Sequence, residues 1–367
     1  MNKITLLIFC LLLLPACRKG DSETHFEEVT DFYTYNAKTG SFTQITDYKT
    51  QNNFAASLFA DGTGFFSLSS FGGAQSLFYH PKLNGTRYPL ITANVINPGY
   101  SSAHPQQKIV SDSGGSFVYY CADFYSGKDP ILFPYSRDIY QVAVSTAAVR
   151  NLTNNVSELV GSVVLSDDGK NLLYDEFDTL TQISSVIILE IASGSRRCVL
   201  KSDSTYLVAP QFVHNSSNIV YLETRRLSIT YDVKIISQTD SSISQKIAIA
   251  SVILSGNFPK LAKNNAYPNR GMDFECELIN LETAQHQSTV LTALDNEFFV
   301  SQSGNLAFIS GGNSRPQLTV FNPLTATSPT ANFSGTALAV HVCDVNSDGS
   351  IVLLLCRRRI NSDTGIL

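Results

Sequence analysis

A short pattern recurs along the chain at intervals close to 45 residues, and this repeat constrains the fold more than any other sequence feature. In each copy an apolar pair runs into a polar turn residue, and a second apolar segment follows. The turn residues stand at 36, 80, 145, 191, 237, 280 and 322, separated by 44, 65, 46, 46, 43 and 42 residues. Seven copies of one pattern predict seven similar structural units.

A second marker alternates with the first, a polar turn that opens an apolar segment. It occurs at Asp61-Gly62, Ser113-Gly114, Asp168-Gly169, Ser216-Ser217, Ser303-Gly304 and Asp348-Gly349. Two hairpin signals in each repeat predict four strands. Many of these strands are continuously apolar, as strands buried on both faces are. The fold class predicted is therefore all-β, a seven-bladed β-propeller of four-stranded blades over residues 31–360.

The two ends of the repeat region are incomplete in complementary ways. The first hairpin, residues 32–46, lacks its two preceding strands, and the last, residues 336–358, lacks its two following strands. Joining them in one blade completes both, so we expect the ring to be closed by both chain ends. Residues 361–367 would then form a short C-terminal tail.

Composition supports a large globular protein and gives no sign of a polyanion partner. The chain is 43% apolar and 16% charged, with 26 Lys and Arg against 31 Asp and Glu. Because no long basic run accompanies this acidic balance, nucleic-acid binding is not expected.

One repeat carries a family resemblance. The segment 163–174 contains Ser166-Asp167-Asp168-Gly169-Lys170, and the apolar segment 187–190 and the basic-apolar segment 196–200 follow it. This order resembles the repeat of TolB-type (WD40-like) β-propellers, and the resemblance implies the same propeller architecture. The chain lacks the additional N-terminal α/β domain of TolB itself, so the resemblance is to the repeats and not to the whole protein.

The N-terminus reads as an export signal. Lys3 precedes the apolar run 4–14, which is too short to span a bilayer. Leu14-Pro15-Ala16-Cys17 resembles the lipobox of bacterial lipoproteins, which implies a signal peptide at 1–16, acylation of Cys17, and a lipidated flexible tether at 17–30. Cleavage by ordinary signal peptidase is the alternative.

The same resemblance predicts the cellular location. We expect the protein to be lipid-anchored in the cell envelope, with the propeller in the periplasm or at the cell surface. Arg18, in place of an aspartate, favours the outer membrane. Outside the leader and the anchor, five cysteines remain, and Cys343 and Cys356 flank one hairpin. They would be either a disulfide or buried free thiols.

No linear motif for catalysis, cofactor or metal binding is present. Six histidines are spread singly along the sequence, at 25, 80, 104, 214, 286 and 341. Because metal sites normally contain a local pair, we expect turn or core roles for them, no metal and no cofactor. Their scarcity also argues against kinship with the oligogalacturonate lyases, a family with TolB-like repeats and a histidine-rich metal site. Asp167-Asp168 are interpreted as turn formers and not as a calcium loop.

Two segments are candidates for contact with a partner. Residues 122–138 contain an insertion that we place in a loop between the second and third strands of a blade. Its aromatic and charged residues are typical of binding surfaces, and capping of its own blade is the alternative. The candidates are Phe124, Tyr125, Lys128, Asp129, Phe133, Tyr135 and Arg137. The second segment, Arg357-Arg358-Arg359, would contact acidic lipid or form a solvated strand end.

These features lead to one principal functional hypothesis and one alternative. The principal hypothesis is a non-enzymatic binding or scaffolding module held at the membrane through its lipid anchor, with an unknown protein or glycan as partner. The alternative is a carbohydrate-active or other hydrolytic or lyase enzyme that uses the axial channel of the propeller. Three or more His, Asp or Glu side chains on the axis would favour the enzyme.

Overall fold

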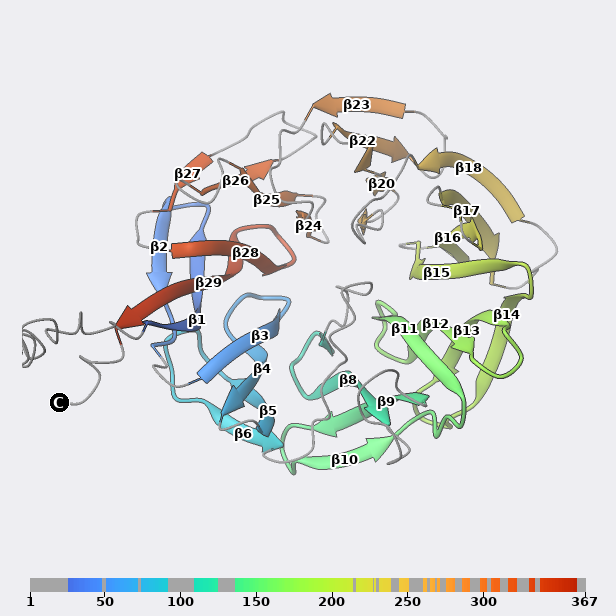
Figure 1. Cartoon of the computed structure of the whole chain (residues 1–367), viewed down its shortest axis with the longest axis horizontal. Coiled ribbons are helices and arrows are strands. Elements are labelled where there is room, and N and C mark those ends of the chain that lie inside the picture. The colour runs from blue at the N-terminus through green and yellow to red at the C-terminus, as the bar shows by residue number, and fades with distance from the viewer. Residues whose placement is uncertain are drawn as a thin grey trace, which may run out of the picture.

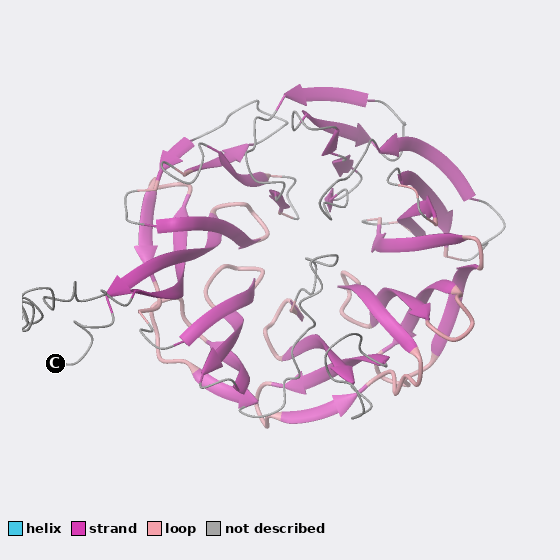
Figure 2. Cartoon of the chain, viewed as in Figure 1, coloured by secondary structure: helices cyan, strands magenta, loops and turns pink. Residues whose placement is uncertain are grey.

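The computed structural model shows a ring of β-sheets that stand around a common centre (Figure 1). Every regular element in the described part of the chain is a strand (Figure 2). The prediction of an all-β fold is therefore confirmed for that part. The described residues are 26–47, 51–71, 74–91, 109–124, 136–213, 216–226, 228, 231–238, 244–250, 260–262, 265–267, 269–270, 275–280, 286–290, 298–301, 305–310, 316–321, 330–333 and 337–361.

One sheet contains strands from both ends of the chain. Its members are β1 (Phe26–Asn36), β2 (Ser41–Gln44), β28 (Ala337–Val345) and β29 (Ile351–Asn361). They lie in the order β2-β1-β29-β28. β1 and β29 pair antiparallel along their whole length, from Phe26 opposite Asn361 to Asn36 opposite Ile351. We call this β1–β29 pairing the seam.

Two sheets follow along the chain. The first has the order β3-β4-β5-β6, and the second has eight strands, β7 to β14. The second sheet consists of two groups of four, β7–β10 and β11–β14, joined by the parallel pairing of Leu159 with Arg137. The strands are β3 (Gln51–Leu58), β4 (Phe65–Phe71), β5 (Ala74–His80), β6 (Tyr88–Ile91), β7 (Val110–Ser111), β8 (Phe117–Phe124), β9 (Ser136–Ala143), β10 (Ala148–Asn151), β11 (Glu158–Leu165), β12 (Asn171–Asp178), β13 (Ser184–Glu190) and β14 (Arg196–Ser202).

Three further sheets complete the described ring. They contain β15 to β18, β19 to β23, and β24 to β27. Their strands are β15 (Thr205–Phe212), β16 (Asn218–Arg225), β17 (Tyr231–Ser237), β18 (Ser244–Ala250), β19 (Lys260–Ala262), β20 (Asn265–Tyr267), β21 (Asn269–Arg270), β22 (Glu275–Asn280), β23 (His286–Val290), β24 (Phe298–Val300), β25 (Leu306–Ser310), β26 (Gln317–Phe321) and β27 (Thr330–Asn332).

The apolar core lies between neighbouring sheets, which explains why the strands are continuously apolar. Leu172 on β12 packs in a buried cluster with Tyr119 of β8. The next residue, Leu173, packs on the opposite face with Leu207 of β15. Successive side chains of a strand point to opposite faces, so a strand between two neighbours needs apolar residues at both.

The sheets have two distinct ends, which define two faces of the ring. At one end lie the turns that follow β3, β7, β11 and β28, residues 59–64, 112–116, 166–170 and 346–350; this is the turn face. The amide of Ser347 donates to Ala60 O, so the turns of neighbouring sheets lie side by side. The opposite end carries Phe26 and Asn361. We call it the terminal face.

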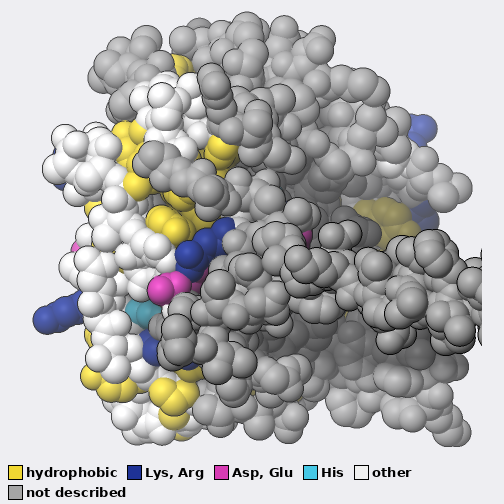
Figure 3. All heavy atoms as spheres, turned by 60° about the vertical axis from the view of Figure 1, so that its left-hand side comes forward, with side chains coloured by type: hydrophobic (Ala, Val, Ile, Leu, Met, Phe, Trp, Pro, Cys, Tyr) yellow, Lys and Arg dark blue, Asp and Glu magenta, His cyan; other side chains and the backbone are white. Residues whose placement is uncertain are grey.

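Charged side chains reinforce the seam. Arg358 on β29 contacts Asp31 of β1 at 2.6 Å and Asp47 at 2.5 Å. Arg357 lies 3.5 Å from Glu28. Figure 3 brings the left-hand side of Figure 1 forward, where β1 and β29 lie, and it shows basic and acidic side chains next to one another. Both arginines thus lie on a strand and have acidic partners within the fold, which agrees with the strand-end interpretation of this basic cluster.

The structure changes several predicted boundaries. β1 begins at Phe26, so residues 26–30, predicted to belong to the tether, form a strand because β29 supplies backbone partners for them. β8 extends to Phe124 and β9 begins at Ser136, so the insertion between them is shorter than predicted. The rest of the extra residues in this 65-residue repeat interval lie between β6 and β7, in residues 92–109.

Cys343 and Cys356 are not joined by a disulfide, so the disulfide alternative is wrong. A β-bulge between Val342 and Asp344 takes Cys343 out of the pairing register, whereas Cys356 pairs with Val340. The leader and Cys17 lie outside the described residues. Within those residues, no helix has the length and hydropathy that a bilayer span requires.

Candidate functional site

A pocket of about 410 Å³ lies where the first strands of four consecutive units meet the turn face. Its walls come from the ends of β3, β7, β11 and β28 and from the turns that follow them. The lining residues are Ser57, Leu58, Phe59, Ala60, Ile109, Val110, Ser111, Asp112, Ser113, Val163, Val164, Leu165, Ser166, Asp167, Asp344, Val345, Asn346 and Ser347.

The turns at 59–64, 166–170 and 346–350 share one local geometry. Asp61, Asp168 and Asp348 each accept a hydrogen bond through Oδ1 from the amide two residues later. The glycine after each aspartate has a positive φ, between 69° and 75°, which favours glycine. The repeated Asp-Gly pair therefore builds the turn. For Asp168, the interpretation as a turn former is confirmed.

Three aspartates from three different units line the pocket. Asp344 follows the bulge in β28, and its Oδ2 accepts from the amide of Leu58 at 2.9 Å, across the junction to β3. Its Oδ1 accepts from the amide of Val345 at 2.8 Å. Asp112 accepts from the amide of Phe117 at 2.8 Å, and Asp167 is exposed in the β11–β12 turn. The remaining polar side chains of the pocket are serines and one asparagine.

The charge of the pocket is acidic. Among the described residues that line it, none is Lys, Arg or His. An acidic cavity with apolar walls concentrates cations and disfavours anionic ligands. Of the described residues, no three His, Cys, Asp or Glu side chains are grouped so that they could hold a metal ion.

His80 has a structural role. It is buried on β5, lies 3.0 Å from Ser67 Oγ, and stacks on Phe65 with ring centroids 3.9 Å apart. Burial, assisted by the nearby positive charge of Arg87, lowers the pKa of His80 to about 3. The ring is therefore neutral in the fold and belongs to the core, as predicted for the histidines.

Most of the predicted partner-binding residues lie in the segment 125–135, outside the described residues. Tyr125, Lys128, Asp129, Phe133 and Tyr135 lie outside the described residues, and Phe124 ends β8. Arg137 is wrong as a surface candidate. It is 5% exposed and donates from Nη1 to Val160 O at 2.9 Å, because it lies on β9 and not in the loop.

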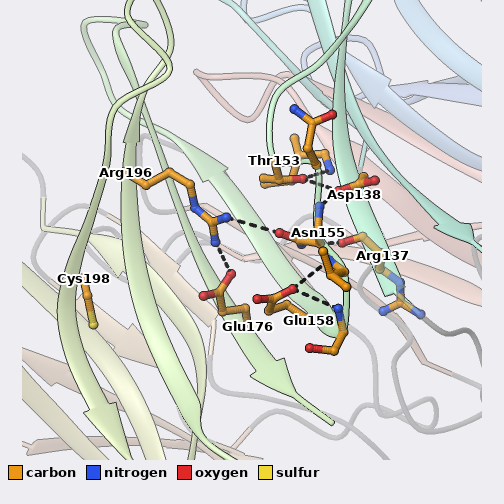
Figure 4. Close-up of polar contacts among 12 residues, drawn as sticks. Arg137, Asp138, Thr153, Asn155, Glu158, Glu176, Arg196 and Cys198 are labelled. Atoms are coloured by element: carbon orange, nitrogen blue, oxygen red, sulfur yellow. Dashed lines mark hydrogen bonds and ion pairs between the residues drawn. The ribbon is translucent and has the colours of Figure 1, made fainter. Parts of the chain in front are cut away.

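Arg137 borders a polar network at the junction between the β7–β10 and β11–β14 groups (Figure 4). Thr153 Oγ1 donates to Asp138 Oδ1 at 2.7 Å, and Asn155 N donates to the same oxygen at 2.6 Å. Arg196 bonds Glu176 at 2.5 Å and Asn155 at 3.3 Å. These contacts connect neighbouring units of the ring, and they lie outside the pocket.

Sequence reasoning did not single out Asp112 or Asp344. A signal was present, since Asp112 directly precedes a polar turn and Asp344 stands near the end of the last apolar repeat strand. These two residues are far apart in the sequence, and they line one pocket only because the sheets assemble around a common centre.

Comparison with known proteins identifies the architecture. No family model and no curated protein matches the chain. Among solved structures, an oligogalacturonate lyase in complex with manganese matches with a TM-score of 0.63 and 14% identity, covering 90% of this chain and 97% of its own. The oligogalacturonate lyase of Vibrio parahaemolyticus matches with a TM-score of 0.62 and 11% identity, covering 91% and 98%. TolB of Acinetobacter baumannii matches with a TM-score of 0.44 and 12% identity, covering 90% and 66%.

The two lyases share the fold of this chain over nearly their full length, and that fold is a β-propeller. This finding overturns the principal functional hypothesis, a non-enzymatic binding or scaffolding module. Both lyases are enzymes, which agrees with the alternative that was set beside it. The scarcity of histidines argued against kinship with the lyases, but the chain has the same fold as these enzymes all the same.

Proposed function

We propose that this protein is a carbohydrate-active enzyme whose active site is the axial pocket. The observation that carries the proposal is the set of three aspartates, Asp112, Asp167 and Asp344, that three units contribute to one pocket at the ring centre. Three or more His, Asp or Glu side chains on the propeller axis are the feature that we expected to favour an enzyme. The lyase neighbours, which have the same architecture, support the same class of substrate.

The residues of the pocket favour hydrolysis over elimination. Glycoside hydrolysis uses two carboxyl groups, one to protonate the leaving oxygen and one to activate water or attack the sugar. Asp344 accepts hydrogen bonds from the backbone amides of Leu58 and Val345, which hold its carboxyl group in one orientation, and a fixed orientation suits the second role. We assign the proton donor to Asp112. Elimination from a uronate would need a cation beside the sugar carboxylate, and the described lining residues supply none.

Manganese chemistry is not part of this proposal. The described residues do not form a group of three or more ligands suited to a metal ion, so they do not fit the manganese of the lyase neighbour. The proposed reaction therefore uses the carboxyl groups alone.

Turnover of a panel of neutral, cationic and uronate oligosaccharides tests the proposal. We expect release of reducing ends, without the ultraviolet absorbance of an unsaturated sugar. Asp344→Asn and Asp112→Asn should each lower kcat by a factor of about 10² to 10⁴. Asp61→Asn is the matched control, because that carboxylate caps its own turn outside the pocket. Equal activity of all three variants, each with a wild-type melting curve, would reject the pocket as the active site.

We further propose that the sheets form seven four-stranded blades of the TolB type and that the seam closes the ring. Support comes from the full-length antiparallel register of β1 with β29 and from the single parallel pairing that divides the eight-stranded sheet into two groups of four. The turn at Asp168-Gly169-Lys170, which matches the TolB-type repeat, has the hydrogen bonds that this motif needs.

We also propose that Cys17 is acylated and anchors the protein in the cell envelope, with the outer membrane favoured. The supporting feature is the Leu14-Pro15-Ala16-Cys17 segment after a short apolar run. Growth with labelled palmitate tests it: the wild type should carry label and Cys17→Ser should not. Label retained by Cys17→Ser would remove Cys17 as the acceptor.

A further inference from the structure

The pocket and the start of the described chain lie at opposite ends of the sheets. In the seam, Phe26 pairs with Asn361 at the terminal face, whereas Asn36 pairs with Ile351 at the turn face. Val345, which lines the pocket, pairs with Val352 at the turn-face end of the same sheet. The whole length of β1 therefore separates the chain start from the level of the pocket.

Chain length limits which face can touch a membrane. Eight residues lie between Cys17 and Phe26. Nine Cα–Cα steps therefore join Cys17 to Phe26, and at roughly 3.3–3.6 Å per step they span at most about 32 Å when fully extended. β1 has 11 residues, and its steps of about 3.3 Å cover roughly 33 Å. Cys17 therefore comes level with the turn face only if the linker runs fully extended along the whole of β1, whereas the terminal face is within its reach at any extension.

The terminal face carries a pair of exposed apolar side chains far from the seam. Val156 is 66% exposed and Leu180 is 70% exposed. Their loops are joined, since Thr179 N donates to Ser157 O at 3.0 Å and Ser157 Oγ donates to Asp178 at 2.8 Å. Asp178 pairs with Glu158 at the start of β11, so this loop pair lies at the end of the sheet opposite the 166–170 turn.

The seam and the loop pair mark two distant points on one face. β1 and β29 lie on the left of the ring in Figure 1, and β12 and β13, which flank Leu180, lie on the right. Exposed aliphatic side chains at loop tips suit the interface between lipid headgroups and acyl chains. A bilayer that touched only the seam side would leave Val156 and Leu180 in water.

We propose that the terminal face is the membrane-contacting surface: the ring lies flat on the bilayer, Leu180 and Val156 contact the lipid, and the pocket faces away from it. This inference rests on the proposed anchor at Cys17. It gives the pocket a defined role, because a mouth directed away from the anchoring membrane receives glycan from the opposite side.

The chain has no Trp, so single Trp substitutions report on each face without background. Leu180→Trp probes the terminal face, and Ser145→Trp probes an exposed turn at the turn face, next to Val144, whose amide donates to Ser116 O. Each full-length acylated variant is reconstituted on vesicles of phosphatidylethanolamine and phosphatidylglycerol, with and without brominated acyl chains. Flotation of the vesicles measures anchoring, and Trp emission measures contact.

We expect both variants to float, and only Leu180→Trp to show blue-shifted emission that brominated lipid quenches. Flotation with no quenching of Leu180→Trp, or with equal quenching of Ser145→Trp, would overturn the flat orientation and leave the anchor intact. Loss of flotation for wild-type protein would overturn the anchor and the orientation together. Neither result bears on turnover in the pocket, which is measured separately.

Discussion

Asp31 and Asp175 are both buried, and they have different hydrogen-bond partners. Asp31, in the seam, is 0% exposed and accepts from Arg358 Nε at 2.8 Å. Asp175, on β12, is 7% exposed and accepts through Oδ1 from the backbone amides of Ser162 at 2.9 Å and Ala209 at 3.2 Å. The seam thus neutralises its buried carboxylate with an arginine, and the interior unit stabilises its own with peptide dipoles.

The difference follows from what each aspartate joins. Asp31 lies on β1, whose neighbour β29 comes from the other end of the chain. Because no short loop connects these two strands, the ion pair of Asp31 with Arg358 helps to hold them together. Asp175 reaches the bulges of β11 and β15, two strands of adjacent units. Gly161 leaves the space for it, since a Cβ there would lie 2.0 Å from Asp175 Oδ2. Burial raises the pKa of Asp175 to about 6.

The largest expected effect comes from removing the seam. Truncation after Asn346 deletes β29 and leaves β1 without the strand that it pairs with over its full length. Because β1 and β28 would lose their backbone partners, we expect loss of cooperative unfolding in thermal and denaturant melts. Truncation after Asn361, which keeps β29, is the control. An unchanged transition in the variant that ends at Asn346 would show that the seam is not needed for cooperative unfolding.

The second prediction concerns the arginine of the seam. Arg358→Ala leaves the buried Asp31 without this partner, and we expect a loss of about 3–5 kcal/mol in the free energy of unfolding. Arg357→Ala is the matched control on the same strand. Its pair with Glu28 is roughly half exposed on both sides, so the loss should be below about 1 kcal/mol. Denaturant melts measure both, and equal losses would contradict the special role of Arg358.

The same comparison shows what sequence reasoning could reach. The repeat and the Asp-Gly turns are local, so the strands, the turns around Asp168 and the meeting of both chain ends follow from the sequence. The pocket is not local, because Asp112 and Asp344 are distant in the chain and meet only through the ring. Arg137 shows the opposite error: a charged residue assigned to the predicted loop 122–138 lies buried because β9 already begins at Ser136.

The third prediction uses the pKa of Asp175. The unfolded chain releases this proton near the ordinary value of 3.8, whereas the folded protein keeps it up to about 6. The folded state therefore binds more protons in this window, and its stability falls as the pH rises from 4 to 6, by about 3 kcal/mol from this group. Above that window the contribution is constant.

Comparison with Asp175→Asn isolates this contribution. The lowered pKa of His80 has the opposite sign, since neutral His80 adds stability as the pH rises from about 3 through its ordinary value of 6.5. The difference between wild type and Asp175→Asn removes the His80 contribution, and we expect that difference to vary between pH 4 and 6 only. A difference independent of pH would reject a proton on Asp175 in the folded state.

The smallest effect separates two copies of one hydrogen-bond motif. Thr46 Oγ1 donates to Asp31 at 3.2 Å, and Thr153 Oγ1 donates to Asp138 at 2.7 Å, and each hydroxyl accepts from the amide that follows the aspartate. Asp31 also has Arg358, whereas Asp138 takes its other hydrogen bonds from Asn151 and Asn155.

Thr153→Val should therefore destabilise the protein more than Thr46→Val. Each substitution removes a hydroxyl that bonds a buried carboxylate and a buried amide, which costs about 1–3 kcal/mol. The contact at Asp138 is the shorter one, and no arginine there retains the carboxylate after the hydroxyl is lost. Thr153→Ser and Thr46→Ser keep the hydroxyl and control for the change in shape. A larger loss for Thr46→Val in denaturant melts would mean that the seam depends on its threonine more than on its arginine.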